Sequence, residues 1–191
     1  MTTLSAFGSG AQLCAYTGEV LSQMASVVQP YVGNRAKTYG EHVGAHLRHI
    51  IEHYDTLAHA LACSETCSNR ACVVDYDARQ RDLRLETNPE VALKRIDLLQ
   101  HALGGIPDPL LERSVDVHTR GGLSGEHDFS TRSSVARELM FLNSHATHHF
   151  AILQGYARQR GETLGAGVGR APATVAYEQR MKHARHELVK A

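Results

Sequence analysis

The chain has 191 residues, a length typical of one domain with a core that needs no disulfide bonds, so we expect a single domain over 1–191. The 20 lysine and arginine residues balance the 20 acidic ones, which argues against a nucleic-acid partner. The sequence has neither a run of about 18 apolar residues nor a signal-peptide pattern at its start, so we expect a cytoplasmic protein without a membrane partner.

The hydrophobic pattern predicts two helices in the first part of the chain. Residues 10–28 repeat apolar side chains at helical spacing, and Pro30 ends this pattern. Residues 38–63 form a second, longer helical pattern that carries several histidines. The charged stretch 73–82 has no clear period, and we expect an extended connection across one end of the helices.

A third helix is predicted from its start and stop signals. Asn88 can cap the first free amides, and Pro89 fits the first helical turn. The pattern continues to about Leu103, where two glycines follow. We expect Pro107 and Pro109 to keep the chain from resuming a helix.

A short hairpin and a fourth helix are expected next. The letters SVDVHTR alternate like a strand, and glycines around them indicate a β-hairpin within 111–129. Ser133 or Ser134 can cap a helix that continues to about Arg160. The tail 161–191 is expected to pack on the helices or on a partner subunit. Together these elements predict an all-α fold, a four-helix bundle with long connections.

Thirteen histidines are the unusual feature of the composition. About one His-x-x-x-His pair is expected by chance at this frequency, whereas the chain contains three. Residues four apart share one face of a helix, close enough for two imidazoles to bind one ion. The pairs are His42/His46, His49/His53 and His145/His149.

The pair on the predicted fourth helix is the strongest candidate for a metal site. On a helical wheel His149 falls about 40° from His145, in the middle of the apolar stripe, whereas His148 falls off its edge. Imidazole nitrogens left without partners there would cost about 1 to 3 kcal/mol each, and a shared metal ion removes this cost. The alternative is a pair of buried histidines bonded to backbone or water.

A third ligand should come from the second helix. His42, His46, His49 and His53 all fall within a stripe about 60° wide beside its apolar face. Geometry alone leaves the choice open, because His46 and His53 point slightly nearer the apolar centre than His49 does.

Two short motifs resemble the DinB-like (YfiT-type) metal-binding four-helix bundle family. In that family a histidine on helix two joins a His-x-x-x-His pair on helix four. The matching pieces are HIIE at 49–52 and HATHHFAI at 145–152, and stretches at 46–54, 75–82 and 167–174 resemble an uncharacterised branch. The resemblance covers most of 38–174 and implies His49, His145 and His149 as the metal ligands.

Three histidines leave at least one position on a zinc, nickel or iron ion for water or substrate. The resemblance implies thiol chemistry, since relatives include bacillithiol and mycothiol transferases and a mycothiol-using isomerase. It also implies a homodimer. Relatives that serve sulfoxide synthases carry an additional domain that this chain is too short to contain. The hypothesis is a metal-dependent transferase or hydrolase acting on a small substrate, with a low-molecular-weight thiol as the candidate.

Other polar residues receive supporting roles in this hypothesis. His46 and His53 would contact the ligands or carry protons, and Glu52 would orient a ligand histidine. Arg79 and Arg81 could bind an anionic substrate, although ordinary surface arginine is the alternative. The rival function is a non-enzymatic metal-binding or stress-response interaction protein. An enzyme should have a cavity beside His149, and a binding module a closed site.

A second cluster contains one histidine and three cysteines. His59, Cys63 and Cys67 recur every four residues, and Cys72 follows. Such residues could bind zinc or form a redox pair, but no second Cys-x-x-Cys element accompanies them. Thiols at the end of a helix are the simpler interpretation.

Overall fold

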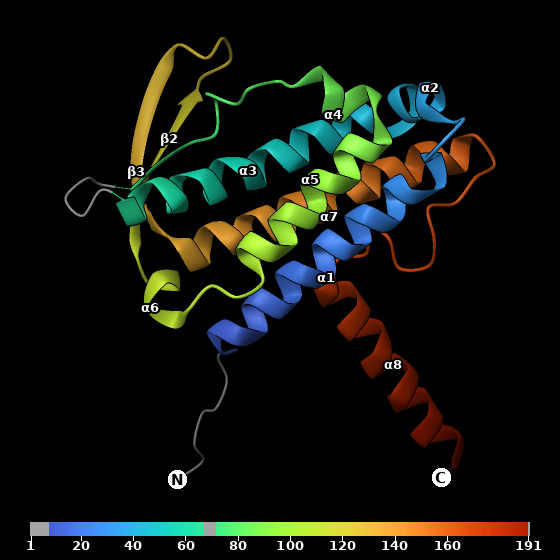
Figure 1. The fold of residues 1–191 in the computed structure, drawn as a ribbon. Helices are drawn as coiled ribbons and strands as arrows, with labels where there is room; N and C mark the ends of the chain where they lie inside the picture. Colours follow the sequence, from blue (N-terminus) through green and yellow to red (C-terminus); the bar gives the residue numbers. More distant parts are fainter. Residues whose placement is uncertain (1–7, 67–71, 191) are drawn as a thin grey trace, which may run out of the picture.

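The computed structural model describes residues 8–66 and 72–190. It is mostly helical and carries a small three-stranded sheet at one end (Figure 1). The longer helices are α1 (Gly10–Val28), α3 (Ala45–Thr66), α5 (Pro89–Leu103), α7 (Val135–Gln159) and α8 (Pro172–Lys190). Shorter helical segments are Gln29–Tyr31, α2 (Ala36–Tyr39), η2 (Gly40–Gly44), α4 (Leu83–Thr87) and α6 (Asp108–Leu111). The strands are β1 (Val73–Asp75), β2 (Ser114–Gly121) and β3 (His127–Ser134).

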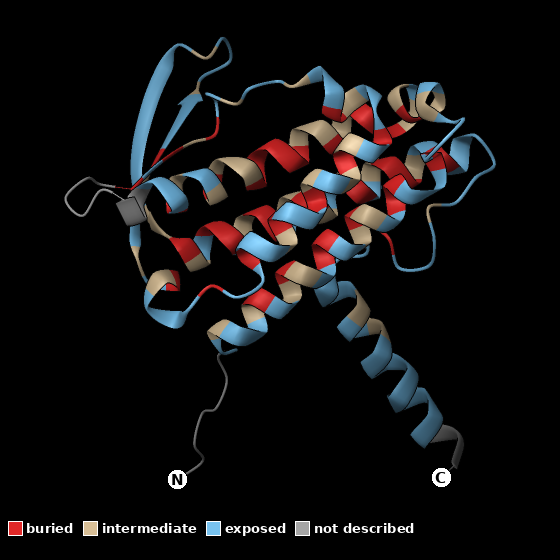
Figure 2. Cartoon of the chain, in the orientation of Figure 1, coloured by how far each residue is buried: buried red, intermediate tan, exposed pale blue. Residues whose placement is uncertain are grey.

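Four of the long helices enclose the core. Helices α1 and α3 each contact both α5 and α7, so every one of the four has two neighbours. Their inward faces are buried and their outward faces are exposed (Figure 2). The largest fully buried side chains are Tyr39, Tyr54, Phe150, Leu21, Met24, Leu47, Ile50, Ile51, Leu57, Ile96, Leu103 and Leu139. Removal of this apolar surface from water is the main stabilising contribution.

Capping residues set the helix starts that the sequence predicted. Ser9 and Gln12 form a reciprocal capping box at α1, and Asn88 accepts from the backbone of α5. Ser134, rather than Ser133, caps α7. Gly161 follows α7 with a φ of 72°, a conformation that favours glycine. The predicted bounds of these three helices are therefore confirmed to within one residue.

The second predicted helix is less regular than expected. It begins as α2, widens into the π-helical turn η2 and continues as α3 without a break. At the widened turn α4 crosses so closely that a Cβ on Gly44 would overlap the backbone carbonyl of Glu86. Neither the π-helical turn nor α4 was predicted from the sequence, and the close approach of the two joins segments far apart in the chain.

The sheet is larger than the expected hairpin. β1 pairs in parallel with β2, and β2 pairs antiparallel with β3 over Ser114 to Gly121. The stretch 73–82 thus begins with a strand, which its charged composition did not indicate. Val74 and Val115 are buried against the helices, whereas the distal part of the hairpin is exposed (Figure 2).

The expectation that Pro107 and Pro109 would prevent a helix was wrong. Pro107 is the N-cap residue of α6, and Pro109 lies in its first turn. Proline is tolerated there because the first amides of a helix have no intrahelical acceptor. The two prolines therefore start a short helix.

The tail after α7 has two parts. Val168 is buried and Gly169 lies against the backbone of Ala151 in α7, so the first part packs on the helices. Helix α8 then projects away from them (Figure 1), and its residues are mostly exposed (Figure 2). Within the described ranges 8–66 and 72–190, no helix is long and apolar enough to cross a membrane.

Candidate metal centre

Helices α3 and α7 bring three histidines together. One ligand atom from each of His49, His145 and His149 lies within 4.8 Å of the others, and all three side chains are half-buried. The Nε2 atoms of His145 and His49 are 3.0 Å apart. The structure therefore groups His49 with the pair on α7, at distances suited to one metal ion.

Both ring nitrogens of His53 are already engaged. Its Nδ1 lies 2.6 Å from the carbonyl oxygen of His49, which can only accept, so Nδ1 carries the proton and donates. Its Nε2 lies 3.3 Å from Nη1 of Arg79 and accepts from that guanidinium. His53 therefore has no ring nitrogen left to bind an ion. It packs beside the three histidines, and its ring centroid is 4.8 Å from that of His145.

His46 contacts the group through His149. The two Nδ1 atoms are 2.8 Å apart, so one ring donates and the other accepts. This contact uses the Nδ1 of His149 and leaves its Nε2 free. Of the second-helix histidines between which the sequence could not choose, His49 joins the group, whereas His46 and His53 contact its members.

Burial keeps these imidazoles neutral at pH 7. It lowers the pKa of His49 to about 3, with His53, His145 and His149 adding smaller contributions. The pKa values of His149 and His53 fall to about 4, again mainly through burial. Burial also lowers the pKa values of His145 and His46. Neutral imidazole is the form that binds metal ions.

The buried face of α7 differs from the one predicted. It is centred about 60° further around the helix, so His149 lies at its edge instead of its middle. On its far side this face contains the apolar Phe150 and Ala157 and also the buried polar side chains Asn143 and Gln154, which a count of apolar residues misses. Tyr156, whose position on the helical wheel is close to that of His149, is 45% exposed. The prediction that His148 lies off the face is correct, since it is exposed.

Two aromatic side chains that the sequence analysis did not single out complete the surroundings. Phe141 stacks on His145, with centroids 5.6 Å apart at 18°. Tyr76 stacks on His53 at 5.4 Å and 24°, and its hydroxyl donates to the buried carboxylate of Glu138 at 2.9 Å. Phe141 precedes His145 by one helical turn, a spacing visible in the sequence, whereas Tyr76 arrives from a separate segment.

The expected supporting residues have different positions. Glu52 is buried; its carboxylate accepts from the Asp82 backbone at 2.6 Å and lies 3.9 Å from Arg79. The Glu52 carboxylate thus contacts the 79–82 segment, and Arg79 and His53 connect it to the histidine group. Arg81 is exposed and has a φ of 53°, in the left-handed region.

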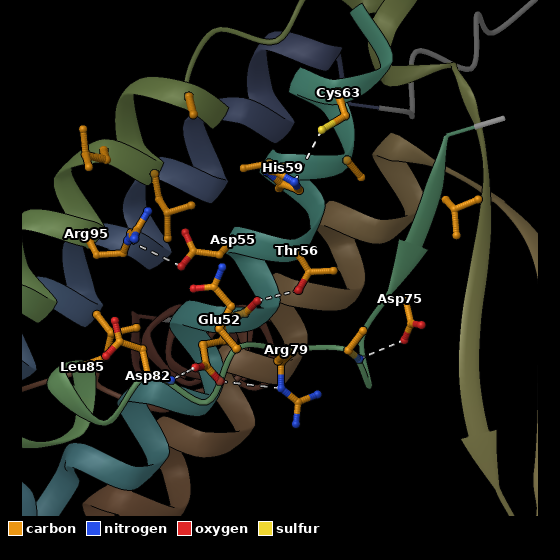
Figure 3. A pocket seen from close by; sticks show the side chains of 18 of the residues that line it. Glu52, Asp55, Thr56, His59, Cys63, Asp75, Arg79, Asp82, Leu85 and Arg95 are labelled. Atoms are coloured by element: carbon orange, nitrogen blue, oxygen red, sulfur yellow. Dashed lines mark hydrogen bonds and ion pairs between the residues drawn. The ribbon is translucent and has the colours of Figure 1, made fainter. Parts of the chain in front are cut away.

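One cavity does not adjoin the histidine group. It has a volume of about 620 Å³ and lies between α3, α5 and the 72–82 segment, with Glu52 and Arg79 in its wall (Figure 3). A smaller cavity of about 340 Å³ is lined by His46 and Tyr156. Because His46 contacts His149, this smaller cavity is the nearer to the expected position beside His149.

Comparison with known proteins leaves the family open. No family model matches the chain, and no solved structure matches it. The chain is similar to FK506-binding protein 5 of Rhizopus delemar, with 27% identity over 103 residues. This match covers 54% of the chain but 27% of that protein, so the chain spans about a quarter of the length of this curated relative.

Proposed function

We propose that His49, His145 and His149 bind one divalent metal ion. The observation that carries the proposal is the convergence of three neutral imidazoles from two helices within 4.8 Å. Nitrogen atoms that share a zinc ion lie about 3.3 Å apart, close to the 3.0 Å between the Nε2 atoms of His49 and His145. Without an ion, one of these two nitrogens carries a proton and donates to the other; an ion would replace this hydrogen bond by two ligand bonds.

The donor set suits zinc, nickel or iron, for which imidazole is a common ligand. Held by these three histidines, such an ion would supply a Lewis acid that can activate water or a thiol at neutral pH. We propose a metal-dependent transferase or hydrolase of the DinB-like four-helix bundle type, acting on a small substrate such as a low-molecular-weight thiol. The resemblance in the two histidine motifs supports the family, and the packing of α1, α3, α5 and α7 is compatible with it.

Neighbouring side chains would prepare the ligands for this role. If His149 binds through Nε2, its Nδ1 keeps the proton and donates to Nδ1 of His46 across 2.8 Å. His53 receives a hydrogen bond from Arg79, which holds a positive charge beside the centre. Arg79 would therefore attract an anionic group of the substrate. The exposed Arg81, two residues further along the chain, adds a second positive charge near it.

A specific observation also favours the second candidate, a non-enzymatic metal-binding or stress-response interaction protein. The 620 Å³ cavity opens on the other side of α3, and the histidine group itself is not among its lining residues. A metal that serves stability or binding does not need a substrate cavity. The name of the Rhizopus protein describes FK506 binding, but the match covers too little of that protein to assign FK506 binding to this chain.

The metal content of the purified protein tests the proposal. We expect about one equivalent of zinc, nickel or iron per chain by elemental analysis, and less than about a tenth of it in His145→Ala and His49→Ala. His148→Ala is the matched control, because this exposed neighbour should retain the metal. Metal-free protein that takes up no ion when titrated, or equal loading of all variants, would refute the site.

Turnover separates the two candidate functions. We expect the metal-loaded protein to accelerate reaction of monochlorobimane with a low-molecular-weight thiol, and chelation to abolish this acceleration. A variant that keeps the ion but loses Arg79, Arg79→Gln, should raise KM for an anionic thiol more than it lowers kcat. Full metal loading without acceleration of any thiol tested would favour the binding protein.

A further inference from the structure

The 620 Å³ cavity contains a group of reactive side chains that the proposed function does not use. Asp55, His59 and Cys63 follow one another at intervals of one helical turn on α3, and all three line the cavity (Figure 3). The opposite wall comes from α5 and includes the apolar side chains of Leu98 and Leu99. The cavity thus joins a polar edge on α3 to an apolar wall on α5.

Cys63 and His59 are in direct contact. The Sγ of Cys63 lies 3.4 Å from Nε2 of His59, and the side chain of Cys63 is exposed. An imidazole at this distance can take the thiol proton and leave a thiolate, which is the nucleophilic form of cysteine. His59 is therefore placed as a base for Cys63 inside a cavity large enough for a small molecule.

Asp55 extends the arrangement by one turn. Burial raises the pKa of its carboxyl to about 6, whereas Arg95 and, more weakly, His59 favour the charged form. The Asp55 carboxylate lies 3.6 Å from Nε of Arg95, which holds it on the α5 side of the cavity (Figure 3). A negative charge one turn before His59 favours the imidazolium that forms when His59 takes a proton.

We propose that Cys63, assisted by His59, is a nucleophilic thiol that adds to small α,β-unsaturated carbonyl compounds bound in this cavity. His59 Nε2 takes the thiol proton, the sulfur forms a bond to the β-carbon, and the alkene electron pair moves to the enolate. The enolate then takes the proton from the imidazolium, so thiol and alkene combine without a leaving group or an external oxidant. An apolar substituent would lie against Leu98 and Leu99.

The other cysteines support this choice. Cys14 and Cys72 are 3% and 4% exposed, and the thiol of Cys72 lies 3.4 Å from the carbonyl oxygen of Ala60. Among the residues that the structure describes, the three-ligand group at metal-binding spacing is the histidine group, which includes neither His59 nor Cys63. Cys67 lies outside the described residues.

Alkylation kinetics test the proposal. Full-length protein is treated at pH 7, in the presence of a chelator, with N-ethylmaleimide or N-phenylmaleimide, and modified cysteines are assigned by peptide fragmentation. We expect Cys63 to react at least about fivefold faster than free glutathione, and His59→Gln to lose at least about threefold of this rate. His101→Gln is the control, since His101 is an exposed histidine outside the cavity.

A second variant tests the cavity itself. Leu98 is 51% exposed, so Leu98→Ser should fold normally, but it should reduce the preference of Cys63 for N-phenylmaleimide over N-ethylmaleimide at least about twofold. The proposal is overturned if Cys63 reacts no faster than glutathione, or if neither His59→Gln nor Leu98→Ser changes its reactivity. The chelator keeps this outcome independent of metal binding at the histidine group.

Discussion

Asn143 links three helices by hydrogen bonds in the otherwise apolar core. The hydroxyl of Tyr54 in α3 donates to its Oδ1 at 2.9 Å, and its Nδ2 donates to Thr17 in α1 at 3.1 Å. Thr17 in turn donates to the carbonyl of Leu13. All three linked side chains are fully buried, so each depends on its partner in place of water.

Replacement of Asn143 by alanine should therefore be costly. It leaves the Tyr54 hydroxyl without its acceptor and Thr17 without its donor, and we expect a loss of about 2 kcal/mol in the free energy of unfolding. Urea unfolding followed by circular dichroism measures this loss. Ser144→Ala is the control, because Ser144 is the exposed neighbour and should change stability by less than about 0.5 kcal/mol. Equal stability of the two variants would contradict the importance of the network.

At the scale of elements, the contact between η2 and α4 fixes how α3 begins. Gly44 leaves room for the backbone of Glu86, whose carboxylate also forms a 2.8 Å ion pair with Arg48 in α3. Since α4 follows directly on the 79–82 segment, this contact also anchors the part of the chain that carries Arg79. A close backbone approach thus helps to position a side chain beside the histidines.

Gly44→Ala should disturb this crossing. The added methyl group meets backbone, which cannot move aside like a flexible side chain, so we expect a loss of about 1 to 3 kcal/mol in unfolding free energy. Gly40→Ala is the matched control, because its Cβ would lie 3.5 Å from the same Glu86 oxygen, an ordinary contact. Greater helix propensity should make Gly40→Ala neutral or slightly stabilising. If both variants unfold alike in a thermal melt, the close approach does not limit stability.

At the scale of the whole molecule, the lowered pKa values of the buried histidines make the stability of the metal-free protein depend on pH. The folded pKa values of about 3 for His49 and about 4 for His53 and His149 lie below the ordinary value of 6.5. Between pH 6.5 and pH 4 the unfolded chain therefore binds more protons than the folded one. The stability that these neutral imidazoles contribute is fully present above pH 6.5 and is lost as the pH falls toward 4.

The melting temperature of the metal-free protein should therefore fall as the pH is lowered. We expect the Tm to fall from pH 7 to pH 4.5, and the slope to become smaller in a His49→Gln variant, which removes the most strongly shifted group. His148→Gln should keep the wild-type slope, because His148 is exposed. A Tm that rises on acidification, or equal slopes for wild type and His49→Gln, would show that burial does not hold these rings neutral.

The sequence by itself determined the helices and the candidate ligands. Local signals such as the Asn88 cap, the Ser134 cap and Gly161 act within a few residues, so the starts and ends of α1, α5 and α7 were predictable. The i, i+4 spacing of His145 and His149 likewise follows from helix geometry alone. In the structure His49, the third histidine that the motif resemblance implied, lies beside this pair.

Only the tertiary structure decided what depends on contacts between distant segments. His53 is excluded from the group because Arg79 and the His49 carbonyl occupy its nitrogens, and no spacing along α3 indicates this. Asn143 belongs to the inner face of α7 because its hydrogen-bond partners lie on α1 and α3, and a count of apolar residues does not show this. Periodicity reports which face of a helix is apolar, whereas hydrogen bonds across helices determine which polar groups can also be buried.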